Sequence, residues 1–159
     1  MSRIKCKRLN VHHLTGIFSV GIISLFLAAC TGKRPDNLGA RDGLLTLCPS
    51  SPNCVSSQAE DGGHKILYLT LMADPDADFA RLAALLRNRA DCAIVEEKSG
   101  YLRVEFHTRL FVDDGEFLLD RDKRLIHLRS ASRVGYSDLG KNRERIEEIR
   151  GEFVKGGKR

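Results

Sequence analysis

The chain has 159 residues, which is enough for one folded domain and too few for two of ordinary size. Basic residues outnumber acidic ones by 26 to 21, a formal net charge of +5. Four of the basic residues and none of the acidic ones precede Cys30, so the remainder is nearly balanced, at 22 to 21. Because a nearly neutral domain has no overall field that attracts a polyanion, we expect no nucleic-acid partner.

The first 29 residues have the pattern of a secretory signal peptide. Basic side chains at the start are followed by an apolar run of 16 residues, Leu14–Ala29, whereas a spanning helix needs about 20. The run ends in Leu-Ala-Ala-Cys at residues 27–30, which resembles the bacterial lipobox. The resemblance implies a cell-envelope lipoprotein that is cleaved before Cys30, acylated on Cys30 and thereby attached to the membrane. Thr31 rather than Asp follows the cysteine, which by analogy with known sorting signals favours the periplasmic side of the outer membrane over the inner membrane. The alternative is an uncleaved anchor helix.

Residues 30–43 would then comprise the lipidated cysteine and a flexible tether. Gly, Pro, Asn, Asp and alternating charges dominate this stretch, which has almost no apolar side chain but Leu38. Such a composition is typical of a solvated linker. We therefore expect a signal peptide over residues 1–29, a tether over 30–43 and one folded domain over 44–159.

Three cysteines remain in the folded domain. Cys48 and Cys54 flank five residues that include two prolines, whose fixed backbone angles could bring the two sulfur atoms together. An oxidising periplasm permits a disulfide, and no pair of histidines accompanies the cysteines, so we expect a bridge rather than a metal site. Metal or redox work by the three cysteines is the alternative. The apolar neighbours of Cys92 favour a buried thiol, and no motif implies a cofactor.

Apolar periodicity predicts two helices and a series of strands. Asp74 and Pro75 form a helix start, and apolar side chains follow them at helical spacing. A second apolar stripe predicts a final helix over residues 141–154. Alternation and turn signals predict strands over residues 66–71, 93–97, 101–110, 116–120 and 124–133. This order indicates an α+β fold, in which an antiparallel meander sheet of four to five strands has both helices packed on one face.

Strand alternation divides the side chains of the predicted sheet between its two faces. In the last strand, Ser130 and Ser132 fall on the face that the helices cover, and Arg129 and Arg133 fall on the opposite face. The basic side chains predicted on that opposite face are Arg103, His107, Arg109, His127, Arg129 and Arg133. Because arginine suits bidentate recognition of carboxylate or phosphate, this face could bind an anion. Alternatively, its arginines pair with carboxylates of neighbouring strands, namely Glu105, Glu116 and Asp120.

The turn between the last strand and the last helix, residues 134–142, adds polar groups. Asp138 can cap the helix or pair with Arg133 or Arg143, and Asn142 can hydrogen-bond a loop carbonyl. A helix N-terminus that faces a basic strand is a ready anion site. The same groups would equally serve as a charged brace that locks the strand to the helix.

Three sequence blocks carry a resemblance. They are Cys-Pro-Ser-Ser-Pro-Asn-Cys-Val-Ser-Ser at residues 48–57, Asp-Asp-Gly-Glu-Phe at 113–117, and Arg-Ser-Ala-Ser-Arg-Val-Gly-Tyr-Ser-Asp-Leu-Gly-Lys-Asn-Arg at 129–143. These blocks resemble the signature blocks of the bacterial and plastid domain-of-unknown-function family 1499, over about Leu44 to Phe153. The resemblance implies a single small domain, often in exported or membrane-associated proteins, and it implies no activity.

These patterns leave three functions open. The first is a binding or accessory module of the envelope that recognises an anionic ligand or an envelope protein, with candidate ligand-binding residues Arg129, Ser130, Ser132, Arg133, Asp138, Asn142 and Arg143. The second is a hydrolase with one of these serines as nucleophile and His107 or His127 as base. The sequence has no Gly-x-Ser-x-Gly elbow, and alternation separates His127 from the serines, so we assign no catalytic residue. The third is a purely structural envelope protein.

Overall fold

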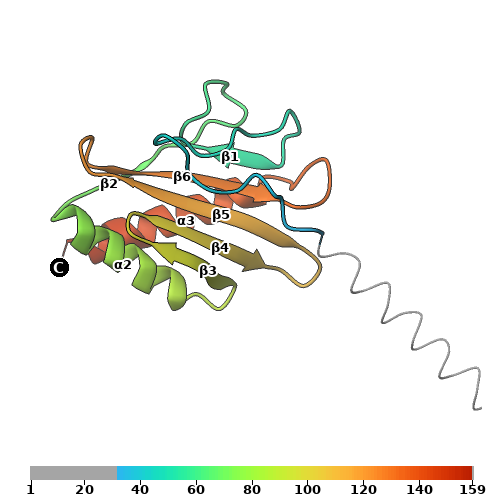
Figure 1. Cartoon of the computed structure of the whole chain (residues 1–159). Coiled ribbons are helices and arrows are strands. Elements are labelled where there is room, and N and C mark those ends of the chain that lie inside the picture. Colours follow the sequence, from blue (N-terminus) through green and yellow to red (C-terminus); the bar gives the residue numbers. More distant parts are fainter. Residues whose placement is uncertain (1–31, 159) are drawn as a thin grey trace, which may run out of the picture. The chain divides into compact units, whose positions relative to one another are not determined.

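The computed structural model describes residues 32–158. The expected signal peptide, the cleavage site and Cys30 therefore lie outside the described residues. Within the described part, the chain forms a six-stranded sheet and two helices (Figure 1). Neither helix of this part has the length and apolar character needed to cross a bilayer.

The sheet is antiparallel throughout. Its strands are β1 (Cys54–Ser56), β2 (Leu69–Thr70), β3 (Cys92–Lys98), β4 (Tyr101–His107), β5 (Val112–Asp120) and β6 (Leu125–Ser132). Strands β3 to β6 form the meander, and β1 and β2 both pair with the remaining edge of β6. The predicted α+β meander is confirmed, and the short strands β1 and β2 bring the sheet to six strands instead of four to five.

Helix α2 (Pro75–Arg87) begins as its sequence predicts. The Asp74 carboxylate accepts a hydrogen bond from the Ala77 backbone N–H at 2.9 Å, and Pro75 occupies the first turn, where a missing N–H costs nothing. The buried carboxylate of Asp78 accepts from the backbone N–H groups of Met72 and Ala73, at 2.7 and 2.9 Å. These contacts fix the chain that enters the helix.

Helix α3 (Lys141–Gly156) packs beside α2 on the same face of the sheet. Apolar side chains of both helices are buried together with those of the strands, so one core fills the space between the helices and the sheet. The helix residues of this core are Phe79, Leu82, Ala83, Leu86, Ile146, Ile149 and Phe153. Gly115 of β5 faces the same core, and a Cβ at this position would lie 2.4 Å from the Phe106 ring, so the aromatic ring takes the space of the missing side chain.

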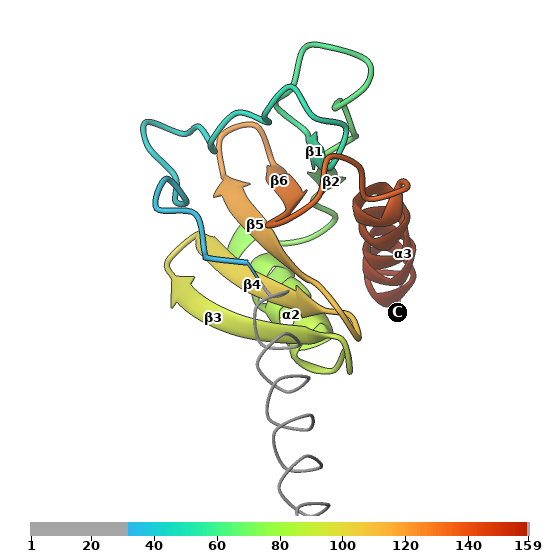
Figure 2. The same ribbon diagram turned by 90° about the vertical axis from the view of Figure 1, so that its right-hand side faces the viewer.

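Residues 32–47, here called the N-terminal segment, lie on the other face of the sheet. Figure 2 shows this segment and α3 on opposite sides of the strands. The Gly39 backbone N–H donates to Glu116 Oε1 at 2.7 Å, and Leu45 is buried with 4% of its surface exposed. Within the stretch for which a tether was expected, the structure shows contacts with the folded domain at Gly39, through this hydrogen bond, and at Gly32, whose backbone packs against Arg133 and Val134.

Candidate functional site

The helix-free face of the sheet carries a row of alternating charges in register. Glu96, Arg103, Glu116 and Arg129 are direct cross-strand neighbours on β3, β4, β5 and β6, and we call them the charge row. Arg103 Nε lies 3.2 Å from Glu96 Oε2, and Arg129 Nη1 lies 3.3 Å from Glu116 Oε2. Opposite charges on neighbouring strands attract, so the row stabilises this register of the sheet.

Glu116 is the centre of the charge row and has 0% of its surface exposed. Besides Arg129, its carboxylate accepts hydrogen bonds from the Gly39 backbone N–H and from the Tyr101 hydroxyl, the latter at 2.8 Å. Burial, together with the adjacent Glu116 carboxylate, raises the pKa of Tyr101, so its hydroxyl keeps the proton that it donates. Three donors thus hold a carboxylate that has no access to solvent.

Arg133 forms a second ion-pair group on the same face. Its guanidinium makes two hydrogen bonds to the Asp114 carboxylate, both 2.8 Å long, and one to Glu105. The Asp114 hydrogen bonds, followed by the one to Glu105, raise the pKa of Arg133. Arg103, Arg129 and Arg133 do gather on the helix-free face, and each of them is paired with a carboxylate of a neighbouring strand.

A cavity of about 290 Å³ lies between the N-terminal segment and the charge row. We call it the Arg129 cavity; its lining residues are Pro35, Asn37, Leu47, Cys48, Pro49, Asp114, Arg129, Ala131 and Ser132. Within the part of the chain that the structure describes, three arginine nitrogens are buried without a hydrogen-bond partner, namely Arg103 Nη1, Arg129 Nε and Arg145 Nε. Buried donors are rarely left unpaired, because each costs about 1–3 kcal/mol. Of these arginines, Arg129 lines the cavity.

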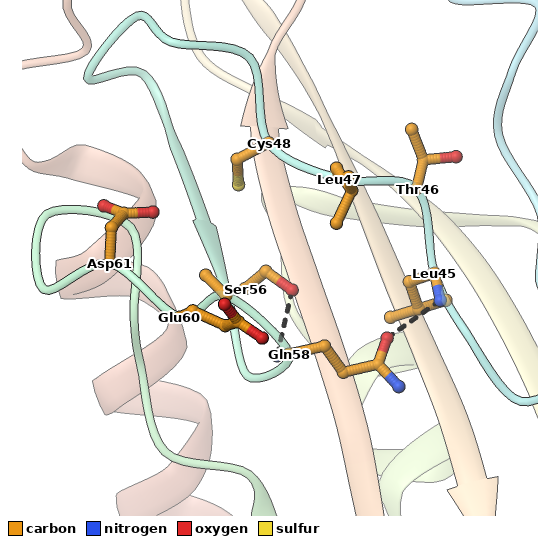
Figure 3. A pocket seen from close by; sticks show the side chains of 9 residues that line it. Leu45, Thr46, Leu47, Cys48, Ser56, Gln58, Glu60 and Asp61 are labelled. Carbon is orange, nitrogen blue, oxygen red and sulfur yellow. Dashed lines mark hydrogen bonds between the residues drawn. The ribbon is translucent and has the colours of Figure 1, made fainter.

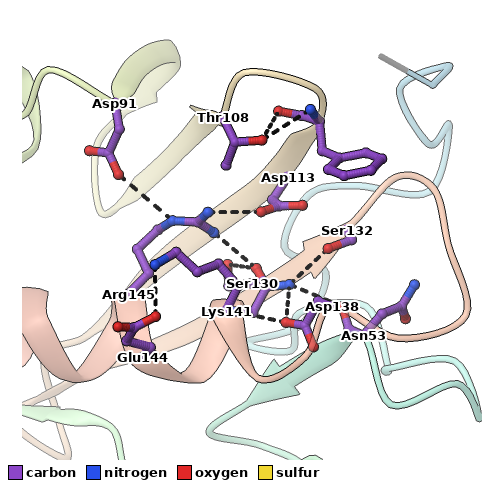
Figure 4. A network of polar contacts seen from close by, with 12 residues as sticks. Asn53, Asp91, Thr108, Asp113, Ser130, Ser132, Asp138, Lys141, Glu144 and Arg145 are labelled. Atoms are coloured by element: carbon purple, nitrogen blue, oxygen red, sulfur yellow. Dashed lines mark hydrogen bonds and ion pairs between the residues drawn. The ribbon is translucent and has the colours of Figure 1, made fainter. Parts of the chain in front are cut away.

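Asn142 joins α3 to β6 on the helix-covered face. Figure 4 shows the polar network of this region, with Ser130, Ser132 and Asp138 close together. Its Oδ1 accepts from Ser130 Oγ at 2.6 Å, and its Nδ2 donates to Ser132 Oγ at 3.0 Å and to Asp138 Oδ2 at 2.8 Å. Asn142 and Ser130 both have 0% of their surface exposed. The structure thus brings four of the predicted site residues together, since the Asn142 amide is hydrogen-bonded to each of the other three.

Arg145 belongs to the same network and was missed from the sequence. Its guanidinium lies 2.9 Å from the Asp113 carboxylate and stacks over the Phe106 ring, 4.6 Å from the ring centroid. Charged side chains surround Arg145 in the sequence of α3, which is typical of a solvated position, yet only 2% of Arg145 is exposed. An inward carboxylate at Asp113, in a strand otherwise apolar on that face, was the signal that could have revealed it.

Arg143 contacts a different part of the chain, the loop before β2. Its guanidinium donates to the backbone carbonyls of Lys65 and Gly63, at 2.8 and 2.9 Å, and so ties α3 to the loop before β2. Arg109 is exposed in the turn after β4, and its side chain has no hydrogen bond or ion pair to any described residue. Arg129, Arg133 and Arg143 therefore contact three separate sets of partners.

His127 lies beside a serine other than those considered for a hydrolase. Ser57 Oγ is 3.3 Å from His127 Nδ1, and His127 Nε2 is 3.8 Å from Asp120 Oδ2. Desolvation lowers the pKa of His127, which favours the neutral imidazole. The backbone N–H groups of Ser57 and Gln58 already donate to Leu128 O and Ser56 Oγ. Acyl transfer needs free N–H donors that stabilise the oxyanion, and these two N–H groups are already engaged.

The cysteines are arranged as expected for a bridge. Cys48 and Cys54 form a disulfide with their Cα atoms 5.7 Å apart, which confirms that prediction. Cys92 is a free thiol, half-buried rather than fully buried, and burial raises its pKa to about 11. Among residues 32–158, no group of three His, Cys, Asp or Glu side chains is placed to hold a metal ion.

A second cavity, of about 510 Å³, lies beside the disulfide (Figure 3). Residues 45–48 of the chain form one wall, and the loop around Gln58 and Asp61 forms the other. Gln58 holds the wall in place, since its Oε1 accepts from Leu45 N at 2.8 Å and its Nε2 donates to Gly43 O at 2.9 Å. The lining contains two carboxylates and no cationic side chain, so it does not suit an anion.

The fold and this site define a small α+β domain with a disulfide between Cys48 and Cys54 and a polar sheet face that the N-terminal segment contacts. A family model for "Protein of unknown function (DUF1499)" matches residues 44–153, and the chain belongs to that family. No curated protein and no solved structure matches the chain. The three sequence blocks that resemble the family supply the disulfide, the centre of the charge row and the Asn142 network.

Proposed function

We propose that this protein is a non-catalytic binding module of the bacterial cell envelope, anchored by lipid at Cys30, that holds an anionic group in the Arg129 cavity. The anchor and the location rest on the sequence of the leader, in which an apolar run of limited length ends in Leu-Ala-Ala-Cys. The binding function rests on one observation: Arg129, a buried arginine whose Nε–H has no partner among the described residues, lines this cavity.

The chemistry of the cavity suits a small ligand with an acceptor oxygen. Arg129 offers a charge-assisted donor, and Asn37 adds a polar group to the wall. Pro35, Leu47 and the disulfide supply apolar surface around them. A few placed polar groups in a mainly apolar wall are the usual composition of a ligand site.

The charges around Arg129 limit what the site can attract. Glu116 faces Arg129, and Asp114 is held by Arg133, so each acid that borders the cavity has its own guanidinium partner. The cavity therefore has no positive field to concentrate polyanions. A directed hydrogen bond from Arg129 would instead hold one carboxylate or phosphate oxygen, which donors bind more strongly than a neutral carbonyl.

Isothermal titration calorimetry on the mature protein tests this function, with acetate and inorganic phosphate as probes and acetamide as the neutral analogue of acetate. We expect the anions to bind and acetamide to bind more weakly. Arg129→Lys keeps the positive charge opposite Glu116 but removes the Nε–H, and it should weaken anion binding about tenfold or more.

Two further variants keep the test decisive. Arg109→Gln removes an exposed guanidinium elsewhere and should leave anion binding unchanged. Ala131→Val fills part of the Arg129 cavity without touching the charge row, so it should weaken binding even if Arg129→Lys fails to fold. Equal affinities for the original protein, Arg129→Lys and Ala131→Val would contradict the function and favour a structural role.

A further inference from the structure

Two loops at one end of the sheet expose large apolar side chains. The turn between β4 and β5 carries Leu110 and Phe111, which are 49% and 46% exposed, and the loop between β6 and α3 carries Tyr136 and Leu139, which are 77% and 97% exposed. We call these four residues the apolar edge. Both loops border one cavity of about 310 Å³, whose lining includes Phe111, Val134 and Leu139. The two loops therefore form one continuous surface.

The loop between β6 and α3 is held firmly in shape. Asn53 Nδ2 donates to Gly135 O at 2.6 Å, and the Asp138 carboxylate accepts from the Gly140 and Asn142 backbone N–H groups at 3.0 and 2.7 Å. Leu139 sits at a φ of +55°, a conformation that a branched side chain rarely adopts. An exposed leucine in a strained, hydrogen-bonded loop is unfavourable in water, so its exposure needs a reason.

The start of the described chain lies beside this loop. A Cβ at Gly32 would lie 2.8 Å from both Arg133 Cβ and Val134 Cγ1, so the backbone of Gly32 packs directly against the beginning of the loop. In Figure 1 the start of the N-terminal segment, the turn after β4 and the loop after β6 lie at the same end of the sheet. Only Thr31 separates Gly32 from Cys30.

We infer that the apolar edge rests in the surface of the bilayer to which Cys30 is attached, an inference that depends on the lipid anchor of the proposed function. Two residues of chain span at most about 7 Å, so acyl chains on Cys30 begin within that reach of the packed backbone of Gly32. A short anchor of this kind brings the nearest loops into contact with the membrane. The bilayer is thus the apolar phase that covers Tyr136 and Leu139.

The side chains that surround the apolar edge suit this position. Arg109 directly precedes Leu110 and is exposed without an ion pair to a described residue. Lys33 and Lys141 are exposed as well, and each is paired with a carboxylate, of Asp36 and Glu144 respectively. Basic side chains at the rim attract anionic headgroups. Tyrosine, with an apolar ring and a polar hydroxyl, is enriched at the boundary between lipid and water.

Fluorescence quenching by brominated lipids tests the inference on the mature lipoprotein. The chain contains no tryptophan, so Tyr136→Trp creates a single fluorescent reporter on the apolar edge. In vesicles of phosphatidylethanolamine and phosphatidylglycerol, we expect its emission to shift to the blue and brominated acyl chains to quench it. Tyr68→Trp, at a 43% exposed position next to β2, is the matched control and should remain unquenched.

A second variant separates insertion from mere proximity. Leu139→Asp in the Tyr136→Trp protein should abolish the quenching, whereas Leu67→Asp, at another exposed leucine, should leave it intact. If the indole of acylated Tyr136→Trp protein stays as exposed with vesicles as without them, the inference is overturned and the apolar edge is left to a protein partner. Protein purified without acyl chains would overturn both the anchor and the inference, while anion binding at Arg129 is measured independently.

Discussion

Asn142 on α3 and Ser130 on β6 meet through a hydrogen bond of 2.6 Å from Ser130 Oγ to Asn142 Oδ1, with both residues fully buried. The same amide donates to the Asn53 backbone carbonyl at 3.1 Å, so one side chain connects the last strand, the last helix and the disulfide loop. Within the sequence block 129–143, the residues on the helix-covered face therefore connect structural elements to one another. The proposed functions concern the helix-free face and the exposed loop between β6 and α3.

Asn142→Leu should lower the free energy of unfolding by about 3 kcal/mol, because the replaced amide leaves Ser130, Ser132 and a backbone carbonyl buried without partners. Urea denaturation followed by circular dichroism measures the change. Asn88→Ala, at an exposed asparagine, is the control and should alter stability by no more than about 0.5 kcal/mol. If both variants lose stability equally, Asn142 is not the brace that its contacts indicate.

Glu116→Gln should destabilise the protein by about 3 kcal/mol or more, because Arg129 would remain buried without a counter-charge. Hydrogen exchange at the Gly39 amide should also accelerate, since its acceptor is weakened. Glu96→Gln, at the more exposed end of the charge row, is the comparison and should cost much less. Unchanged protection of Gly39 in Glu116→Gln would show that the N-terminal segment is held by other contacts.

His64 should titrate above the ordinary histidine value near 6.5, because hydrogen bonds to Asp61 Oδ1 and to the Ser51 carbonyl raise its pKa. A raised pKa in the folded state means that the stabilisation is complete below about pH 6.5 and is lost as the pH rises through the folded pKa. His64→Gln should therefore cost more stability in mildly acidic than in alkaline solution. Nuclear magnetic resonance titration checks the pKa directly, and Asp61→Asn should bring it down.

Ser57 should not react with a fluorophosphonate probe. Its hydroxyl lies near His127, but the Ser57 and Gln58 backbone N–H groups are engaged, and Asp120 is 3.8 Å from the imidazole. Mass spectrometry after incubation with the probe provides the measurement. Stoichiometric labelling that disappears in Ser57→Ala would revive the hydrolase alternative and contradict a non-catalytic module.

Alternation within the strands was enough to predict which residues share a face. The period of two placed Arg129 and Arg133 on one side of β6 and Ser130 and Ser132 on the other. The contacts agree with that division, since both serines are hydrogen-bonded to Asn142 of α3 and both arginines are paired with carboxylates of β5. Two local signals were equally sufficient: the Asp74–Pro75 start of α2 and the closely spaced pair Cys48 and Cys54. Each depends on a few neighbouring residues and not on distant contacts.

The features that the sequence did not reveal all depend on distant contacts. β1 has three residues and is a strand only because β6 lies beside it. The polar composition of residues 32–43 is typical of a linker, yet Glu116, 77 residues beyond Gly39, supplies a hydrogen-bond acceptor. Arg145 looked solvated until Asp113 and the Phe106 ring were placed against it. Partners so far apart in the chain leave no local pattern.

Native mass spectrometry of the mature protein, released from its own envelope in mild detergent, tests the central claim most directly. If Arg129 holds an anionic group, the original protein and Arg109→Gln should carry an added mass that dissociates in negative-ion mode as a carboxylate or phosphate, and Arg129→Lys should have lost it. Identical ligand-free masses for all three proteins, each correctly folded and fully acylated, would contradict the claim that the Arg129 cavity is a binding site.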